Sequence, residues 1–207
     1  MTIDQLHRHL TAHTPTLMDV KARYAVLVPL VELDNEPHLL FETRAATLRF
    51  QPREVCFPGG RIEPGESSVE CALRETREEL GIPSECIHVL GELDFLCHRS
   101  GFAIFPILAR VDAQVVQQLV LNPDEVDEIF LVPLSSLFSL TPEEYSFALI
   151  PAPAEDFPYE SIGIPKDYPW PNGIESGPIY SWQDKAIWGI TGRITRHLLS
   201  LLNQEGA

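Results

Sequence analysis

Apolar residues gather along the chain in short runs of the kind that form β-strands. The segments Arg23–Leu33 and His38–Arg44 are rich in such residues, and the turn-forming sequence "DNEP" separates them. Two apolar runs around a turn predict a pair of neighbouring strands. The same pattern predicts three further strands, at Ile87–Leu96, Phe102–Val111 and Glu128–Leu134.

Helical spacing of apolar residues appears in three other segments. Ile3–Leu10 fits a short amphipathic helix, and Ala186–Leu202 fits a longer helix near the end of the chain. The segment from about Ser68 to Leu80 has the clearest boundaries. Ser67 and Glu70 have the spacing of a capping box, and a glycine and a proline follow the segment. These signals predict a helix from about Ser68 to Leu80.

The segment Thr141–Pro178 has a different composition. It contains eight prolines, interleaved with Phe157, Tyr159, Tyr168 and Trp170. Prolines at this density disfavour a regular helix or a central strand, so we expect an irregular insertion at about 141–178. A surface excursion packed down by its aromatic side chains is the interpretation we favour, and a lid or specificity loop is the alternative.

Length and charge limit the functions open to the chain. A chain of 207 residues with 44 % hydrophobic residues suits one domain, 1–207. The net charge of −15 argues against nucleic acid as a partner, because phosphate backbones bind basic surfaces. No apolar run is long enough to span a membrane, the first residues lack a signal-peptide pattern and the four cysteines are scattered, so we expect a cytoplasmic protein.

The predicted helix over Ser68–Leu80 carries an unusual set of acids. Advancing 100° per residue places Glu75, Glu78 and Glu79 together on the side opposite the apolar face formed by Val69, Ala72, Leu73, Thr76 and Leu80. Carboxylates one turn apart repel each other, whereas a solvated helix face normally mixes charges. The helix also follows the glycine turn "PGG". A solvated face remains the alternative, but carboxylates beside a glycine turn favour a Mg²⁺ site.

These residues complete a motif that resembles the signature of the Nudix hydrolases. The signature positions are filled by Gly60, Glu66, Arg74, Glu75, Glu78, Glu79 and Gly81, with Ile82 at its apolar end. Thr76 is the one departure, since an apolar residue is expected there. The resemblance implies the Nudix fold, an α/β/α sandwich with a mixed β-sheet. It also implies a diphosphate-cleaving enzyme that uses Mg²⁺ or Mn²⁺.

A second motif is similar to the extra signature of the coenzyme A diphosphatase branch of that family. Arg44, Ala45, Arg49 and the sequence Phe57-Pro58-Gly59-Gly60 match it. Glu42 stands near an expected threonine, and Arg53 stands at an expected glycine.

The resemblance implies a role for each acid and for Arg74. Glu78 and Glu79 would be metal ligands together with the backbone carbonyl of Gly59, and Glu75 would be either a further ligand or the general base. Glu66 would support the site, Arg74 would orient a glutamate, and Glu125 would be an additional ligand from a distant loop or an ordinary loop charge.

The same resemblance implies the substrate and the groups that bind it. Arg44, Arg49, Phe57, Gly59 and Gly60 would contact substrate, as would Arg53 unless it forms surface ion pairs. Coenzyme A or an acyl derivative would be cut to 4′-phosphopantetheine and adenosine 3′,5′-bisphosphate. The alternatives are an enzyme for ADP-ribose, NADH or nucleoside triphosphates, and a non-catalytic ligand-binding module. Whether the protein forms a homodimer is left open.

Overall fold

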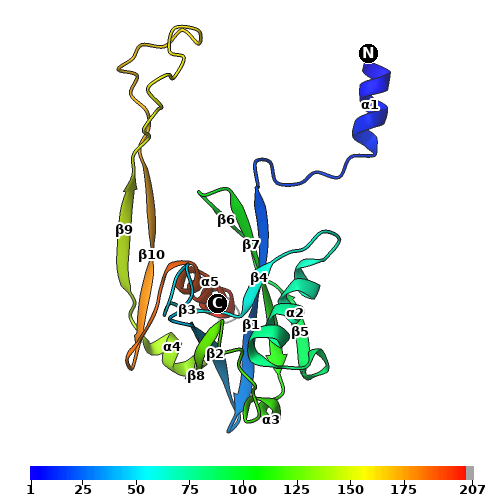
Figure 1. Ribbon diagram of the computed structural model, residues 1–207, viewed down its shortest axis with the longest axis vertical. Coiled ribbons are helices and arrows are strands. Elements are labelled where there is room, and N and C mark those ends of the chain that lie inside the picture. The colour runs from blue at the N-terminus through cyan, green and yellow to red at the C-terminus, as the bar shows by residue number, and fades with distance from the viewer. Residues whose placement is uncertain (204–207) are drawn as a thin grey trace.

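An eight-stranded mixed sheet forms the centre of the protein, in a computed structural model that describes residues 1–203 (Figure 1). Its strands are β1 (Ala22–Leu33), β2 (Glu36–Arg44), β3 (Val55–Cys56), β4 (Gly59–Arg61), β5 (Ile87–Glu92), β6 (Leu96–His98), β7 (Phe102–Val111) and β8 (Val126–Pro133). The main order is β3-β2-β1-β7-β5, with β4 beside β1, β6 beside β7 and β8 beside β2. The sheet is mixed because β1 and β7 run parallel while the other pairs are antiparallel.

Helices cover both faces of this sheet. The helices are α1 (Ile3–Thr11), α2 (Ser68–Leu80), α3 (Ala113–Val116), α4 (Leu134–Ser139) and α5 (Gly189–Asn203), and a short 3₁₀ turn spans Ser84–Cys86. Adjacent residues of the central strand β1 serve opposite layers. Leu27 packs in the core that contains Leu80 of α2, whereas Val28 packs in the core that contains Leu198 of α5. The predicted α/β/α sandwich is therefore confirmed.

The predicted strands are present, with differences at two places. The single strand expected over Ile87–Leu96 is interrupted, so that β5 ends at Glu92 and β6 begins at Leu96. Both segments pair with β7, and a register shift in the β5 pairing bends the edge of the sheet there. The helix expected from Ala186 begins only at Gly189, because Lys185–Ile187 instead form β11 against β10 (Gly173–Trp182).

The proline-rich insertion is more ordered than predicted. Its flanks form an antiparallel ribbon of β9 (Glu143–Leu149) and β10, which projects from the body in Figure 1. Only the connection over 150–172 is irregular. Six of the eight prolines lie in that connection, which leaves the flanks free to pair. The expected aromatic packing is present there, since Trp170 makes edge-to-face contacts with Phe157 and Tyr168.

The first helix also stands apart from the body. No residue of α1 is buried, and Thr2 and Gln5 form a capping box that satisfies its first turn. In Figure 1 it stands above the body at the upper right, and the tip of the β9–β10 ribbon reaches the same height at the upper left. Within residues 1–203, no helix has both the length and the apolar character needed to cross a membrane.

Candidate active site

Local signals fix both ends of α2, which carries most of the candidate residues. The Ser67 side chain accepts a hydrogen bond from the Glu70 backbone N–H, and the Glu70 carboxylate accepts one from the Ser67 N–H at 2.8 Å. Gly81 ends the helix in the left-handed conformation, with φ of 70°. The predicted helix, its capping box and its stop are confirmed, and Glu70 is structural.

The prediction that Glu79 lies away from the packing face is wrong. Its side chain is only 5 % exposed, and it accepts a hydrogen bond of 2.8 Å from the backbone N–H of Gly59. Glu79 follows the buried Thr76 by three positions, and residues three apart on a helix share a face. Glu79 therefore points toward the sheet at the edge of the packing face, while Glu78 remains exposed.

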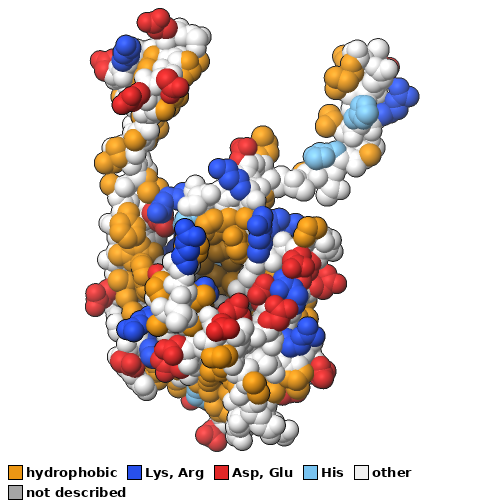
Figure 2. Space-filling model, in the orientation of Figure 1, with side chains coloured by type: hydrophobic (Ala, Val, Ile, Leu, Met, Phe, Trp, Pro, Cys, Tyr) orange, Lys and Arg blue, Asp and Glu red, His pale blue; other side chains and the backbone are white. Residues whose placement is uncertain are grey.

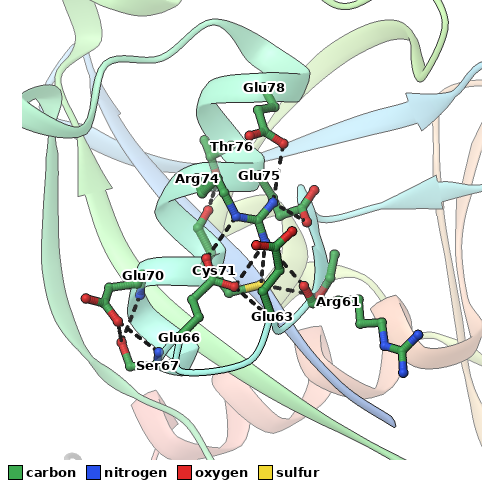
Figure 3. A network of polar contacts seen from close by, with 12 residues as sticks. Arg61, Glu63, Glu66, Ser67, Glu70, Cys71, Arg74, Glu75, Thr76 and Glu78 are labelled. Carbon is green, nitrogen blue, oxygen red and sulfur yellow. Dashed lines mark hydrogen bonds and ion pairs between the residues drawn. The ribbon is translucent and has the colours of Figure 1, made fainter.

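Arg74 connects Glu75 and Glu78 of the helix with Glu66, which precedes it (Figure 3). Its guanidinium contacts both oxygens of Glu66, with Nε–Oε1 at 2.8 Å and Nη2–Oε2 at 3.1 Å. Its Nη1 atom lies 2.7 Å from Glu75 Oε1 and 3.3 Å from Glu78 Oε2. The hydrogen bond from Arg74 is the main reason that the pKa of Glu66 falls to about 2. Glu66 and Arg74 thus form a charged bracket that orients Glu75.

The turn before the helix brings backbone against these carboxylates. A Cβ atom added to Gly60 would lie 2.2 Å from Glu75 Oε1, and one added to Gly59 would lie 2.3 Å from the carbonyl oxygen of Ala25. Only glycine allows both approaches. Partial burial raises the pKa of Glu75, with repulsion from Glu78 and Glu125 adding to the effect and Arg74 opposing it.

Glu42 joins this group, although its position was noted in the sequence only as a departure from a motif. It lies on β2 and is 1 % exposed. Burial raises its pKa to about 7, and burial together with repulsion from Glu42 raises the pKa of Glu79 to about 9. The alternation of side chains along a strand could have indicated from the sequence that Glu42 is buried. Glu42 follows Leu40 by two positions, and Leu40 packs in the core beneath α2.

Glu125 is brought to the same place by the loop before β8. The Asn122 side chain donates a hydrogen bond of 2.9 Å to its carboxylate. The Asn122 N–H donates to the Glu79 carbonyl at 2.8 Å, which ties this loop to the end of α2. Repulsion from Glu125 contributes to the raised pKa values of Glu42, Glu75 and Glu79.

The basic residues of the second motif differ in their surroundings. Arg44 follows Glu42 on the same side of β2 and lowers the pKa of that acid, yet its buried Nε has no acceptor within residues 1–203. Arg49 is exposed and lies over the Phe50 ring, with 5.2 Å between its guanidinium carbon and the ring centre. Arg53 is also exposed. Of these three arginines, Arg44 is the one whose charge is shown to act on a carboxylate of the cluster, Glu42.

The backbone conformation explains the motif position of Arg53, and packing in the core explains that of Phe57. Arg53 has φ of 62°, which shows why glycine is expected there, and its N–H still donates to the Arg44 carbonyl. The left-handed conformation of a non-glycine residue costs about 1–2 kcal/mol. The hydrogen bond from the Arg53 N–H to the Arg44 carbonyl helps to hold the loop in this conformation. Phe57 is only 3 % exposed and stacks on Phe41 with 4.8 Å between ring centres. The Phe57 ring is therefore part of the core, and its contact with substrate stays a prediction.

Figure 2 shows the surface of the molecule in the orientation of Figure 1. The face seen there is hollowed at its centre, with hydrophobic side chains inside and basic side chains on the rim, next to acidic side chains over α2. An anionic ligand can thus meet local cations although the whole chain is acidic.

The donor chemistry of the carboxylates fits Mg²⁺ or Mn²⁺. Both are hard cations that prefer oxygen ligands, and they would relieve the repulsion among Glu42, Glu75, Glu79 and Glu125. In the side-chain conformations described for residues 1–203, no three acidic, histidine or cysteine side chains meet at metal-binding distance. Glu75 is turned toward Arg74 and Glu79 toward the Gly59 N–H, so metal binding requires these side chains to reorient.

The raised pKa values predict how stability depends on pH without metal. The pKa of Glu79 rises from 4.5 to about 9, so the folded protein binds more protons than the unfolded chain between these values. The free energy of unfolding should therefore fall as pH rises from about 5 to 9. Urea unfolding in EDTA across this range will measure the slope. Glu79→Gln should flatten it, whereas a surface control, Glu144→Gln, should keep it; equal slopes in all three proteins would contradict the assignment.

Comparison with known proteins gives a consistent result. The profile of the NUDIX domain matches residues 21–149. Nudix hydrolase 3 of Caenorhabditis elegans is 33 % identical over 192 residues, which cover 90 % of this chain and 76 % of the relative. The uncharacterized Nudix hydrolase NudL of Yersinia pestis (strain Pestoides F) is 33 % identical, with 92 % of this chain and 84 % of the relative covered.

Among solved structures, the chain resembles the binary complex of a C. elegans Ap4A hydrolase. The two are 21 % identical with a TM-score of 0.47, and the match covers 56 % of this chain and 83 % of the other. The family profile and the 33 % identical relatives carry the assignment. This chain belongs to the Nudix hydrolase family.

Proposed function

We propose that the protein is a metal-dependent diphosphatase that cuts coenzyme A or its acyl derivatives into 4′-phosphopantetheine and adenosine 3′,5′-bisphosphate. The observation that supports this substrate most directly is Arg44. Its buried Nε lacks an acceptor within residues 1–203, and its charge acts on Glu42 of the carboxylate cluster. A guanidinium at this position can bind a phosphate oxygen with its unused donor.

The side chains of the carboxylate cluster and the nearby arginines would have different roles in hydrolysis. A bound Mg²⁺ or Mn²⁺ would neutralise charge on the diphosphate and make the attacking water more acidic. Glu79, Glu78 and the Gly59 carbonyl would hold the metal, with Glu125 as an added ligand. Arg44 would align the diphosphate, and the exposed Arg49 and Arg53 would be available to the 3′-phosphate.

Glu75 has the geometry of a proton acceptor. Its Oε1 atom is held by Arg74 Nη1 at 2.7 Å, which leaves Oε2 to take a proton from water. Partial burial raises its pKa, and a carboxylate accepts a proton more readily when its pKa is higher. Glu66 fixes Arg74 through two contacts and thereby acts on Glu75 from a distance. Direct ligation by Glu75 is the alternative role.

Two other functions fit the same site less specifically. Other Nudix substrates such as ADP-ribose, NADH or nucleoside triphosphates also present a diphosphate, and one solved neighbour is named for hydrolysis of Ap4A. A non-catalytic binding module would keep the fold, but it would not need the bracket that Arg74 and Glu66 form around Glu75.

Product analysis distinguishes these substrates. The protein is incubated with Mg²⁺ or Mn²⁺ and coenzyme A, acetyl-coenzyme A, NADH, ADP-ribose, dGTP or Ap4A, and products are separated by ion-pair chromatography. We expect adenosine 3′,5′-bisphosphate from coenzyme A and its thioester, and no product in EDTA. Dephospho-coenzyme A is the matched control, because it keeps the diphosphate and lacks the 3′-phosphate. Intact coenzyme A beside cleavage of another compound would overturn the substrate assignment.

A further inference from the structure

Glu42 is an acid that the family signature does not include, and the sheet places it beneath the catalytic helix. It pairs across the sheet with Cys56 of β3 and with Ile129 of β8, so strands flank it on both sides. Its side chain points to the same face as Leu40, which packs in the core that contains Leu80 of α2. Glu42 therefore approaches the Gly59–Glu79 contact from the sheet side.

One oxygen of Glu42 is left without a partner. Oε1 accepts a weak hydrogen bond from the Cys56 thiol at 3.2 Å. Oε2 is fully buried and has no hydrogen-bond donor among residues 1–203. Arg44, the nearest cation on its own strand, makes no hydrogen bond with it in the described residues. Leaving a buried polar atom unsatisfied is costly, and a carboxylate beside other carboxylates is costlier still.

Packing alone does not account for an acid here. An apolar residue of similar volume would fill the same space without an unsatisfied oxygen, and replacing buried charges in this way is often stabilising. The arrangement becomes favourable when a cation lies between Glu42 and Glu79, since it would satisfy the free oxygen and relieve the repulsion together. Hard oxygen donors of this kind are the ligands of Mg²⁺ and Mn²⁺.

We propose that Glu42 is a further ligand of the divalent metal in this protein, contributed by the sheet opposite the ligands of α2. The inference rests on the metal-dependent function proposed above. It assigns the unpartnered Oε2 atom to the metal and leaves Oε1 with the Cys56 thiol. The metal is thus bound between the sheet and the helix, and its binding ties the two layers together.

The experiment measures Mn²⁺ binding without substrate. Wild-type protein, Glu42→Gln and Glu42→Asp are titrated with Mn²⁺ at pH 8 by calorimetry and by the free-Mn²⁺ electron paramagnetic resonance signal. We expect Glu42→Gln to raise the Kd for Mn²⁺ at least about tenfold, in the range seen for groups that tune metal sites. Glu42→Asp, which keeps the carboxylate, should lie between the two. Glu36→Gln is the matched control, because Glu36 begins the same strand and contacts Ser135 instead, and its Kd should equal that of wild type.

Thermal unfolding separates a ligand from a structural residue. In EDTA, Glu42→Gln should unfold at the same temperature as wild type or higher, because an unpaired buried acid has been removed. Added Mn²⁺ should then raise its Tm less than that of wild type. An unchanged Kd for Mn²⁺, or a lower Tm in EDTA with an unchanged Mn²⁺ shift, would overturn the proposal and leave the proposed function standing. Absence of Mn²⁺ binding by wild type would overturn both.

Discussion

Replacing Glu79 with Gln should lower kcat for diphosphate hydrolysis roughly 100- to 10,000-fold, the range expected for loss of a group that acts directly in the reaction. The amide is nearly the same size and still offers an oxygen to the Gly59 N–H, which lies 2.8 Å from the Glu79 carboxylate. It removes only the charge. The fold should therefore be kept, and the loss should appear in kcat together with a weaker dependence of rate on Mg²⁺ concentration.

The control for this variant is Glu144→Gln. Glu144 is an exposed residue of β9 that pairs with Arg196, far from the glycine turn in sequence. Rates are measured with saturating Mg²⁺ for all three proteins, and circular dichroism checks the fold. A Glu79→Gln protein with the wild-type rate would remove Glu79 from the mechanism. A non-catalytic module, by contrast, predicts that none of the proteins cleaves any substrate.

Replacing Gly59 with Ala should destabilise the whole domain. The added methyl would lie 2.3 Å from the Ala25 carbonyl oxygen and 2.6 Å from the Val26 Cα, both of which are backbone atoms of β1. Backbone in a central strand cannot move aside as a side chain can, so β4 would have to separate from β1. We expect a loss of about 3 kcal/mol in the free energy of unfolding, measured by urea denaturation.

Gly60→Ala provides the matched comparison one residue later. Its methyl would meet the Glu75 carboxylate at 2.2 Å, and the nearest atoms all belong to that flexible side chain. The Glu75 side chain can move aside, so the free energy of unfolding should change by less than about 1 kcal/mol. The value of kcat should fall, because this movement breaks the contact between Glu75 and Arg74. Equal losses of stability in the Gly59 and Gly60 variants would show that the turn responds as one rigid unit and would contradict this distinction.

The sequence predicted best those features that depend on local chemistry. The capping box of Ser67 and Glu70 and the left-handed Gly81 determine α2 through residues close to one another in the chain. The burial of Glu79 was mispredicted because it was grouped with Glu75 and Glu78 on the side opposite the apolar face, although its distance of three residues from Thr76 placed it at the edge of the packing face. Within the part of the chain that the structure describes, the acid is satisfied by the Gly59 N–H, twenty residues earlier.

Features that depend on distant pairing were harder to predict. The alternation along β2 could have indicated that Glu42 is buried, but its neighbours Cys56 and Ile129 depend on the registry of β2 with β3 and β8, which no local pattern contains. The antiparallel pairing of β9 with β10 was not predicted, because the proline-rich connection separates the two strands in the sequence. Arg53 is the intermediate case. A family motif indicated glycine, and the left-handed backbone at Arg53 shows that the turn is kept without it.

The parallel pairing of β1 with β7 has a consequence for synthesis on the ribosome. Residues of β1, the glycine turn and α2 all leave the ribosome before β7, yet Ile107 and Val111 of β7 complete the core on which α2 packs. A short amphipathic helix gains most of its stability from such packing. The acidic helix therefore remains without its full docking surface until the chain beyond Val111 has emerged. The nascent chain assembles the carboxylate cluster only after that point, when β7 has paired with β1.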